Sequence, residues 1–161
     1  MSLVISPTGA IDAGVFATFE DATLEDVVDA MGNGEAGEAS FDFGMNYAHA
    51  NGSVTSVDLT VTLTILLPVW EPEEEPSRPE SNEWNRFLRA LRAHEDGHID
   101  IFRREAAVTY RRLLASKPSK IVDKLESERR RIKRLSDAYD TRTGHGTTQQ
   151  TAHGTTVITI P

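Results

Sequence analysis

The sequence lacks several features that would place it in a familiar class. It has no cysteine in 161 residues, which excludes a disulfide scaffold, a thiolate zinc site, an iron–sulfur cluster and a cysteine nucleophile. Its longest apolar stretch, residues 57–70, is interrupted by Asp58 and several threonines, so no segment is suited to span a bilayer. A chain of this length can still bury a substantial core, and we expect one domain over residues 1–161.

Basic residues are scarce in the first part of the chain. Residues 1–100 contain 4 basic and 19 acidic side chains, whereas residues 101–161 contain 13 basic and 6 acidic ones. The net formal charge of −8 argues against a nucleic-acid partner. The basic run at residues 129–134 has no interleaved aromatic residues, and we interpret it as a solvated helix face.

The N-terminus lacks the pattern of a signal peptide. The sequence itself leaves both the compartment and the oligomeric state open.

The first 70 residues are predicted to be mainly β. From residue 41 to 47 and from 57 to 67, every second residue is apolar, which is typical of half-buried strands. Asn51-Gly52 between these runs is a tight-turn signal, so we predict a β-hairpin over residues 41–67. Residues 15–19 are a further candidate strand, and the spacing over residues 23–31 predicts a short helix.

Helical periodicity begins after residues 68–80, which are rich in proline and glutamate and are expected to form a loop. The spacing predicts one helix from Ser81 or Asn82 to about residue 116 and a second over about 119–138, separated at Pro118. Residues 140–161 are a polar tail whose end either adds a strand or stays irregular. We therefore expect an α+β fold in which a small antiparallel sheet packs on a long helix and on a second helix antiparallel to it. The two helices together form a helical hairpin over residues 81–139.

One motif in the first long helix carries chemistry: the pattern His-Glu-x-x-His from His94 to His98. Residues four apart share a helix face, so both imidazoles can reach one tetrahedral Zn²⁺. Zinc lowers the pKa of water that it binds, and Glu95 can then act as the general base. Both histidines lie on an apolar stripe from Phe87 to Ile101, so they are expected to face the core. The alternative is a pair of core histidines without metal.

A catalytic zinc site needs a third protein ligand and an open position. Folding the two helices back on each other about Pro118 brings residues 137–145 level with the two histidines. His145 is the preferred third ligand; Asp140 is either the ligand instead or the acceptor that orients a histidine. Asp100 is a further candidate for orienting a ligand. Tyr139 is a candidate donor to an oxyanion, or simply the last residue of an apolar stripe.

Other polar residues are weaker candidates. Arg104 stands six residues after His98, where a metzincin would carry its third histidine. The remaining acids lie too far along the helices, and the remaining histidines lie by a turn and in the polar tail, where solvated side chains are expected: Glu105, Glu126, Glu128, His49 and His153.

These motifs resemble a bacterial family catalogued as domain of unknown function 922. The resemblance includes an apolar-Pro-x-Trp ending at Trp70, a His-Glu-x-Gly-His-x-Asp-Ile box from His94 to Ile101, and a Tyr-Asp-x-x-Thr-x-His-Gly box from Tyr139 to Gly146. Beyond the second box the sequence fits less well, and the resemblance assigns no role to the two glutamines that follow.

The resemblance implies a zincin-like fold and zinc-dependent hydrolysis of a peptide or protein substrate, in an exported protein. In such a fold a small sheet packs on the active-site helix, and an edge strand pairs with the extended peptide; one strand of the predicted hairpin would serve. The alternative is an inactive zinc-binding domain in which a fourth side chain such as Asp140 closes the site. The intact Glu95 favours the enzyme, because a structural site needs no base.

Overall fold

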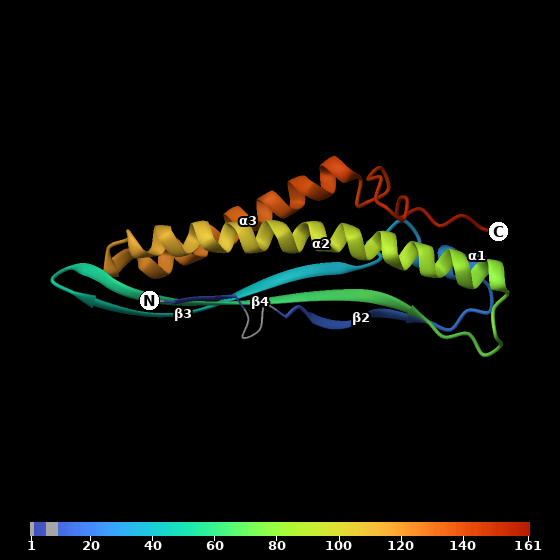
Figure 1. The fold of residues 1–161 in the computed structure, drawn as a ribbon, viewed down its shortest axis with the longest axis horizontal. Helices are drawn as coiled ribbons and strands as arrows, with labels where there is room; N and C mark the ends of the chain where they lie inside the picture. The colour runs from blue at the N-terminus through green and yellow to red at the C-terminus, as the bar shows by residue number, and fades with distance from the viewer. Residues whose placement is uncertain (1, 6–9) are drawn as a thin grey trace.

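The computed structural model describes residues 2–5 and 10–161, and it shows a long helix lying along a sheet with a second helix folded back on it (Figure 1). The fold is α+β, as predicted. In chain order the elements are β1 (Ser2–Ile5), β2 (Asp12–Phe19), α1 (Leu24–Met31), β3 (Glu38–Ala50), β4 (Ser53–Trp70), α2 (Arg78–Leu114), the 3-10 helix η1 (Pro118–Lys120) and α3 (Ile121–Thr143).

The sheet is built around β4. β3 pairs antiparallel with β4 through a turn at Asn51 and Gly52, both at positive φ, which confirms the predicted hairpin. On the other edge, β1 runs parallel to residues 58–61 and β2 runs parallel to residues 64–70. The sheet is therefore mixed, not wholly antiparallel. Hydrophobic alternation shows which face of a strand is buried, but it carries no information on strand direction.

The core lies between one face of the sheet and the two long helices. Even-numbered side chains at the middle of β4, such as Asp58 and Thr60, are exposed on the opposite face. This alternation is what a sheet covered on one side requires. The buried residues of β4 and those of α2 and α3 that pack with them include Val57, Leu59, Val61, Leu63, Ile65, Ile99, Phe102, Ile121 and Ile132.

The helix α2 begins earlier and the helix α3 ends later than predicted. Ser77 caps α2, and its hydroxyl and the carboxylate of Glu80 form a capping box, so the predicted cap at residue 81 or 82 was wrong. Pro79 fits there because the first turn of a helix needs no backbone N–H. At the other end α3 continues to Thr143 and closes on the left-handed Gly144. Residues 140–143, predicted as the start of the polar tail, are therefore helical.

The tail after α3 forms no named strand, apart from an isolated bridge between Thr151 and Gly154. Its last residues stay irregular, which was one of the two predicted outcomes. As expected, no helix among the described residues has the length and apolar character needed to cross a membrane.

A buried ionic cluster joins α3 to α2. The guanidinium of Arg131 donates to Glu105 Oε2 at 2.6 Å and to Glu128 Oε2 at 2.7 Å, and both carboxylates are buried. Burial acts to raise the pKa of each carboxyl. Hydrogen bonds from Arg131, and then from Arg104 or Arg112, outweigh that effect, so both pKa values lie below the usual 4.5.

We predict that Arg131→Met lowers the free energy of unfolding by about 3 kcal/mol at neutral pH, because two buried carboxylates lose their shared partner. Since the folded pKa values lie below the unfolded ones, this stabilisation is present above the unfolded value of 4.5 and is lost as the pH falls through the folded values. Urea denaturation at about pH 7 and about pH 3 measures it, with Arg134→Met, on the exposed face of α3, as the control. An equal loss at both pH values would contradict the prediction.

Candidate metal centre

His94 and His98 lie one turn apart on the buried face of α2. Their side chains are only 4% and 6% exposed, because the same face carries the apolar residues that pack on the sheet. The two rings meet edge to face, with centroids 5.0 Å apart. Both histidines therefore point between α2 and α3, and the predicted inward orientation is confirmed.

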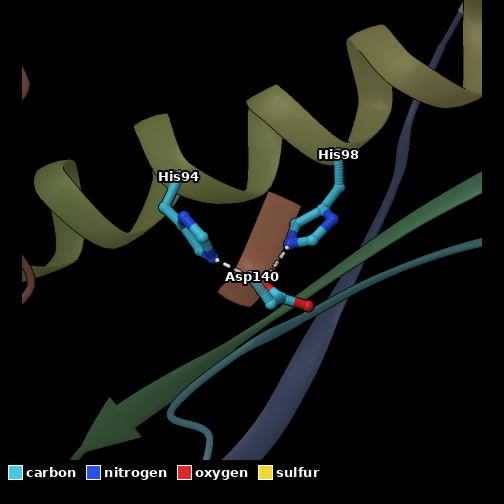
Figure 2. Close-up of side chains that lie close together, drawn as sticks. All are labelled: His94, His98 and Asp140. Carbon is cyan, nitrogen blue, oxygen red and sulfur yellow. Dashed lines mark hydrogen bonds and ion pairs between the residues drawn. The ribbon is translucent and has the colours of Figure 1, made fainter. Parts of the chain in front are cut away.

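Asp140 approaches both histidines from α3. Its Oδ1 lies 3.2 Å from His94 Nε2 and 2.9 Å from His98 Nε2 (Figure 2). The ligand atoms of the three residues all lie within 4.8 Å of one another. The antiparallel hairpin accounts for the meeting, since it returns the chain along α2 to the level of the motif. Two imidazoles and a carboxylate are a donor set that suits zinc.

The second nitrogen of each ring is held by a polar side chain. His94 Nδ1 lies 2.9 Å from Gln149 Oε1, and His98 Nδ1 lies 2.7 Å from Ser136 Oγ. An amide oxygen only accepts hydrogen bonds, so the Nδ1 of His94 carries a proton and donates. Burial lowers the pKa of His98 below its usual 6.5 despite the opposing charge of Asp140. The lowered pKa favours a neutral His98. In both rings Nε2 faces Asp140, as it must to bind a metal at this place.

Glu95 is buried beside the histidines, where α2 faces the start of β3. It is 4% exposed, and its carboxylate is hydrogen-bonded by the backbone of Ala39. Burial, followed by the negative charges of Asp140, Glu35 and Glu38, raises the pKa of Glu95 to about 8. The residue predicted as general base thus lies in the same buried region as the two histidines.

His145, the preferred third ligand of the sequence analysis, lies at the rim. Its side chain is 58% exposed, and its Nδ1 is 3.8 Å from both Asp140 Oδ1 and Glu35 Oε1. Its backbone has a φ of 52°, which follows from the left-handed end of α3 one residue earlier. Asp140, the alternative, is the carboxylate that reaches both histidines, and His145 as a ligand stays a prediction.

Tyr139 packs against α2, the helix that carries both histidines. Its ring stacks on that of His94 with centroids 5.1 Å apart, and its hydroxyl donates to Gln149 Oε1 at 2.9 Å and reaches the His94 carbonyl at 3.3 Å. A Cβ on Gly97 would lie 2.1 Å from the Tyr139 oxygen. The glycine inside the His-Glu-x-x-His motif therefore makes room for Tyr139.

Gln149 is the site residue that sequence reasoning missed. It accepts hydrogen bonds from His94 and from Tyr139, yet its only signal in the sequence is its position three residues after the box that ends at Gly146. The tail that carries it is anchored on α2, where Arg86 donates to the backbone carbonyls of His153, Thr155 and Val157 at 3.0, 2.8 and 2.5 Å. The tail therefore forms part of the site.

A cleft of about 850 Å³ opens beside the two histidines. Its walls are residues 34–41 at the start of β3, the motif face of α2, the facing side of α3, and residues 156–158 of the tail. Glu95, both histidines and Asp140 line it together. This volume lies within the range of ligand-binding clefts in proteins.

Several other candidates lie away from the cleft. Asp100 is exposed on α2, and within the described residues no hydrogen bond joins it to either histidine, so the structure gives it no orienting role. His49 and His153 are exposed, as expected. The glutamates that the sequence analysis ranked low, Glu105 and Glu128, belong to the ionic cluster instead.

The sequence profile of a bacterial protein family of unknown function, DUF922, matches residues 16–146. The chain belongs to this family. The match covers the sheet from within β2, both long helices and the box that ends at Gly146, and it stops before Gln149. Neither the curated proteins nor the solved structures gave a match to this DUF922 chain.

We predict that Gly97→Ala destabilises this DUF922 protein, although alanine is normally about 1 kcal/mol better than glycine in a helix. The added methyl would overlap the Tyr139 hydroxyl and displace the ring that stacks on His94. Thermal unfolding of Gly97→Ala beside Gly44→Ala measures the effect, because a Cβ on Gly44 meets only Thr60 at an ordinary 3.6 Å. A Gly97→Ala melting temperature at or above that of the unmodified protein would refute the close approach.

Proposed function

We propose that this DUF922 protein is a zinc-dependent peptidase. The observation that carries the proposal is the direction of the ring nitrogens. His94 donates through Nδ1 to Gln149, so in its neutral form the lone pair on Nε2 faces Asp140 Oδ1 at 3.2 Å. A lone pair and a carboxylate oxygen repel each other unless a proton or a cation lies between them. The donor set is therefore suited to a cation bound by His94, His98 and Asp140.

Bound zinc would lower the pKa of water and polarise a carbonyl. Glu95 lies in the same cleft and is the chain's candidate general base. The charge of bound zinc would oppose the burial and the acidic neighbours that raise its pKa, so that its carboxylate takes a proton from the attacking water and returns it to the leaving amine. Tyr139 is placed to orient this region through His94 and Gln149. Donation by its hydroxyl to a developing oxyanion would require that it leave Gln149 Oε1, with which it now shares a bond of 2.9 Å.

The free edge of β3 is the proposed binding place for the peptide or protein substrate. Within the described residues β3 pairs only with β4, and residues 38–41 of β3 line the cleft. An extended peptide can add to such an edge through main-chain hydrogen bonds. A substrate bound in this way would pass over Glu95, which already uses the backbone of Ala39 as a partner.

A second candidate is a zinc-binding domain without catalysis. It is favoured by one observation, the 3.8 Å between His145 Nδ1 and Asp140 Oδ1. A small movement would bring His145 to the centre as a fourth protein ligand, and a tetrahedral site with four side chains has no open position. The two candidates differ in their response to changes at Glu95 and His145.

We predict about one zinc per chain after dialysis, measured by elemental analysis. His94→Ala and His98→Ala should each weaken zinc binding by more than about 100-fold, because each removes a first ligand. Asp140→Asn and His145→Ala then identify the third ligand, since only one of them should lose the ion if three side chains bind it. The exposed His49→Ala is the control and should keep the metal; full zinc content in His94→Ala would exclude the site.

Glu95→Gln is predicted to keep zinc but to lower peptide hydrolysis by about 10²- to 10⁴-fold, the usual contribution of a general base. Mass spectrometry of a peptide mixture incubated with zinc-loaded protein measures it, with His153→Ala as the matched control. Unchanged turnover in Glu95→Gln would contradict the mechanism. If the unmodified protein binds zinc but hydrolyses no peptide, the second candidate, a zinc-binding domain without catalysis, is the one that remains.

A further inference from the structure

The free edge of β3 is open over a short length only. The backbone of Ala39 bonds Glu95, and the Phe43 carbonyl accepts from the guanidinium of Arg129, so both residues face the outer edge. The pairing of β3 with β4 is unbroken from Glu38 to Ala48, and alternate residues of a strand point their backbone groups to the same edge. Phe41 therefore presents its N–H and C=O outward, between these two occupied positions.

Arg129 closes this edge at its far end. Besides the Phe43 carbonyl, its guanidinium binds the carboxylate of Asp42. It also lies 5.6 Å from the centroid of the Phe43 ring. A peptide that follows the edge past Phe41 therefore cannot continue along β3 and must turn towards α3.

Arg130 is the cation that such a peptide would meet. It lines the cleft and is exposed, and no ion pair engages it anywhere in the described part of the chain. Its neighbours in the cleft are already paired: Lys133 holds Asp137 at 2.8 Å, and Arg129 holds Asp42. A guanidinium is well suited to bind a carboxylate through two parallel hydrogen bonds.

The rest of the cleft disfavours a substrate carboxylate. At the start of β3 the wall carries the exposed acids Glu35 and Glu38, and the neighbouring wall is lined by apolar residues such as Met31 and Leu91. Negative charge is repelled by the first region and finds no partner in the second. The Arg130 end is thus the part of the cleft where a carboxylate gains a favourable interaction.

We propose that Arg130 binds a carboxylate of the substrate and so sets which peptides the cleft accepts. This inference rests on the proposed peptidase function. Arg130 precedes Asp140 by ten residues of α3, which is about 15 Å along a helix. An extended peptide covers that distance in four or five residues. The carboxylate, from an acidic side chain or from a free C-terminus, therefore lies four or five residues from the bond that is cut.

The test uses ten-residue peptides of alanine, leucine and serine, acetylated and amidated, with one aspartate or asparagine moved from position to position. A further series keeps asparagine but leaves the C-terminus free. Mass spectrometry locates the cuts made by zinc-loaded protein. We expect aspartate to exceed asparagine by about three- to fivefold at low salt, only at four or five residues from the cut, as for an exposed ion pair. A preference confined to the free C-terminus would assign the carboxylate to that source.

Arg130→Glu should abolish or reverse the preference, whereas Arg134→Glu makes the same charge change one turn away, outside the cleft, and should preserve it. An aspartate preference unchanged in Arg130→Glu overturns the inference. Binding of fluorescent versions of the same peptides to Glu95→Gln separates it from the proposed function. Binding that depends on Arg130 without any cutting rejects the peptidase but keeps the carboxylate site. Equal cutting rates for aspartate and asparagine at every position would keep the peptidase but reject the carboxylate site.

Discussion

The burial of two imidazoles on one face of α2 is the constraint on which the rest of the site depends. Buried polar rings are costly unless each nitrogen has a partner. Here Ser136 of α3 and Gln149 of the tail contact the two Nδ1 atoms, and both Nε2 atoms face Asp140 of α3, where a proton or a cation would complete the set. The two histidines find these partners only if α3 folds back on α2 in this register and the tail returns across α2. Both features of the fold therefore depend on the same polar centre.

The ionic cluster of Arg131, Glu105 and Glu128 lies further from the site along the helical hairpin. It fixes the same alignment of α3 against α2. Arg131 connects α3 to α2 through two buried carboxylates, and nine residues further along α3 stands Asp140, which meets the histidines. A shift of α3 by one turn would break both sets of contacts at once. The hairpin is thus held at two separate points, and the cleft between β3, α2 and α3 keeps a defined shape.

Much of this was accessible from the sequence. The helix stripe from Phe87 to Ile101 predicted that His94 and His98 point inward, and the break at Pro118 predicted which segment of the second helix returns to them. The hairpin in the sheet followed from alternation and one turn. The start of α2 was misplaced, because the prolines and glutamates before residue 81 resemble a loop in composition while one of them belongs to a capping box.

What the sequence determined by itself was local: the period of each element, the spacing that puts two imidazoles and a glutamate on one helix, and the place where the helices turn. The tertiary structure decided the parallel pairing of β1 and β2 with β4, the approach of Asp140 rather than the rim residue His145, and the use of Gln149. The physical reason is that periodicity reports which face of an element is buried, whereas these three outcomes depend on contacts between segments that are distant in the chain.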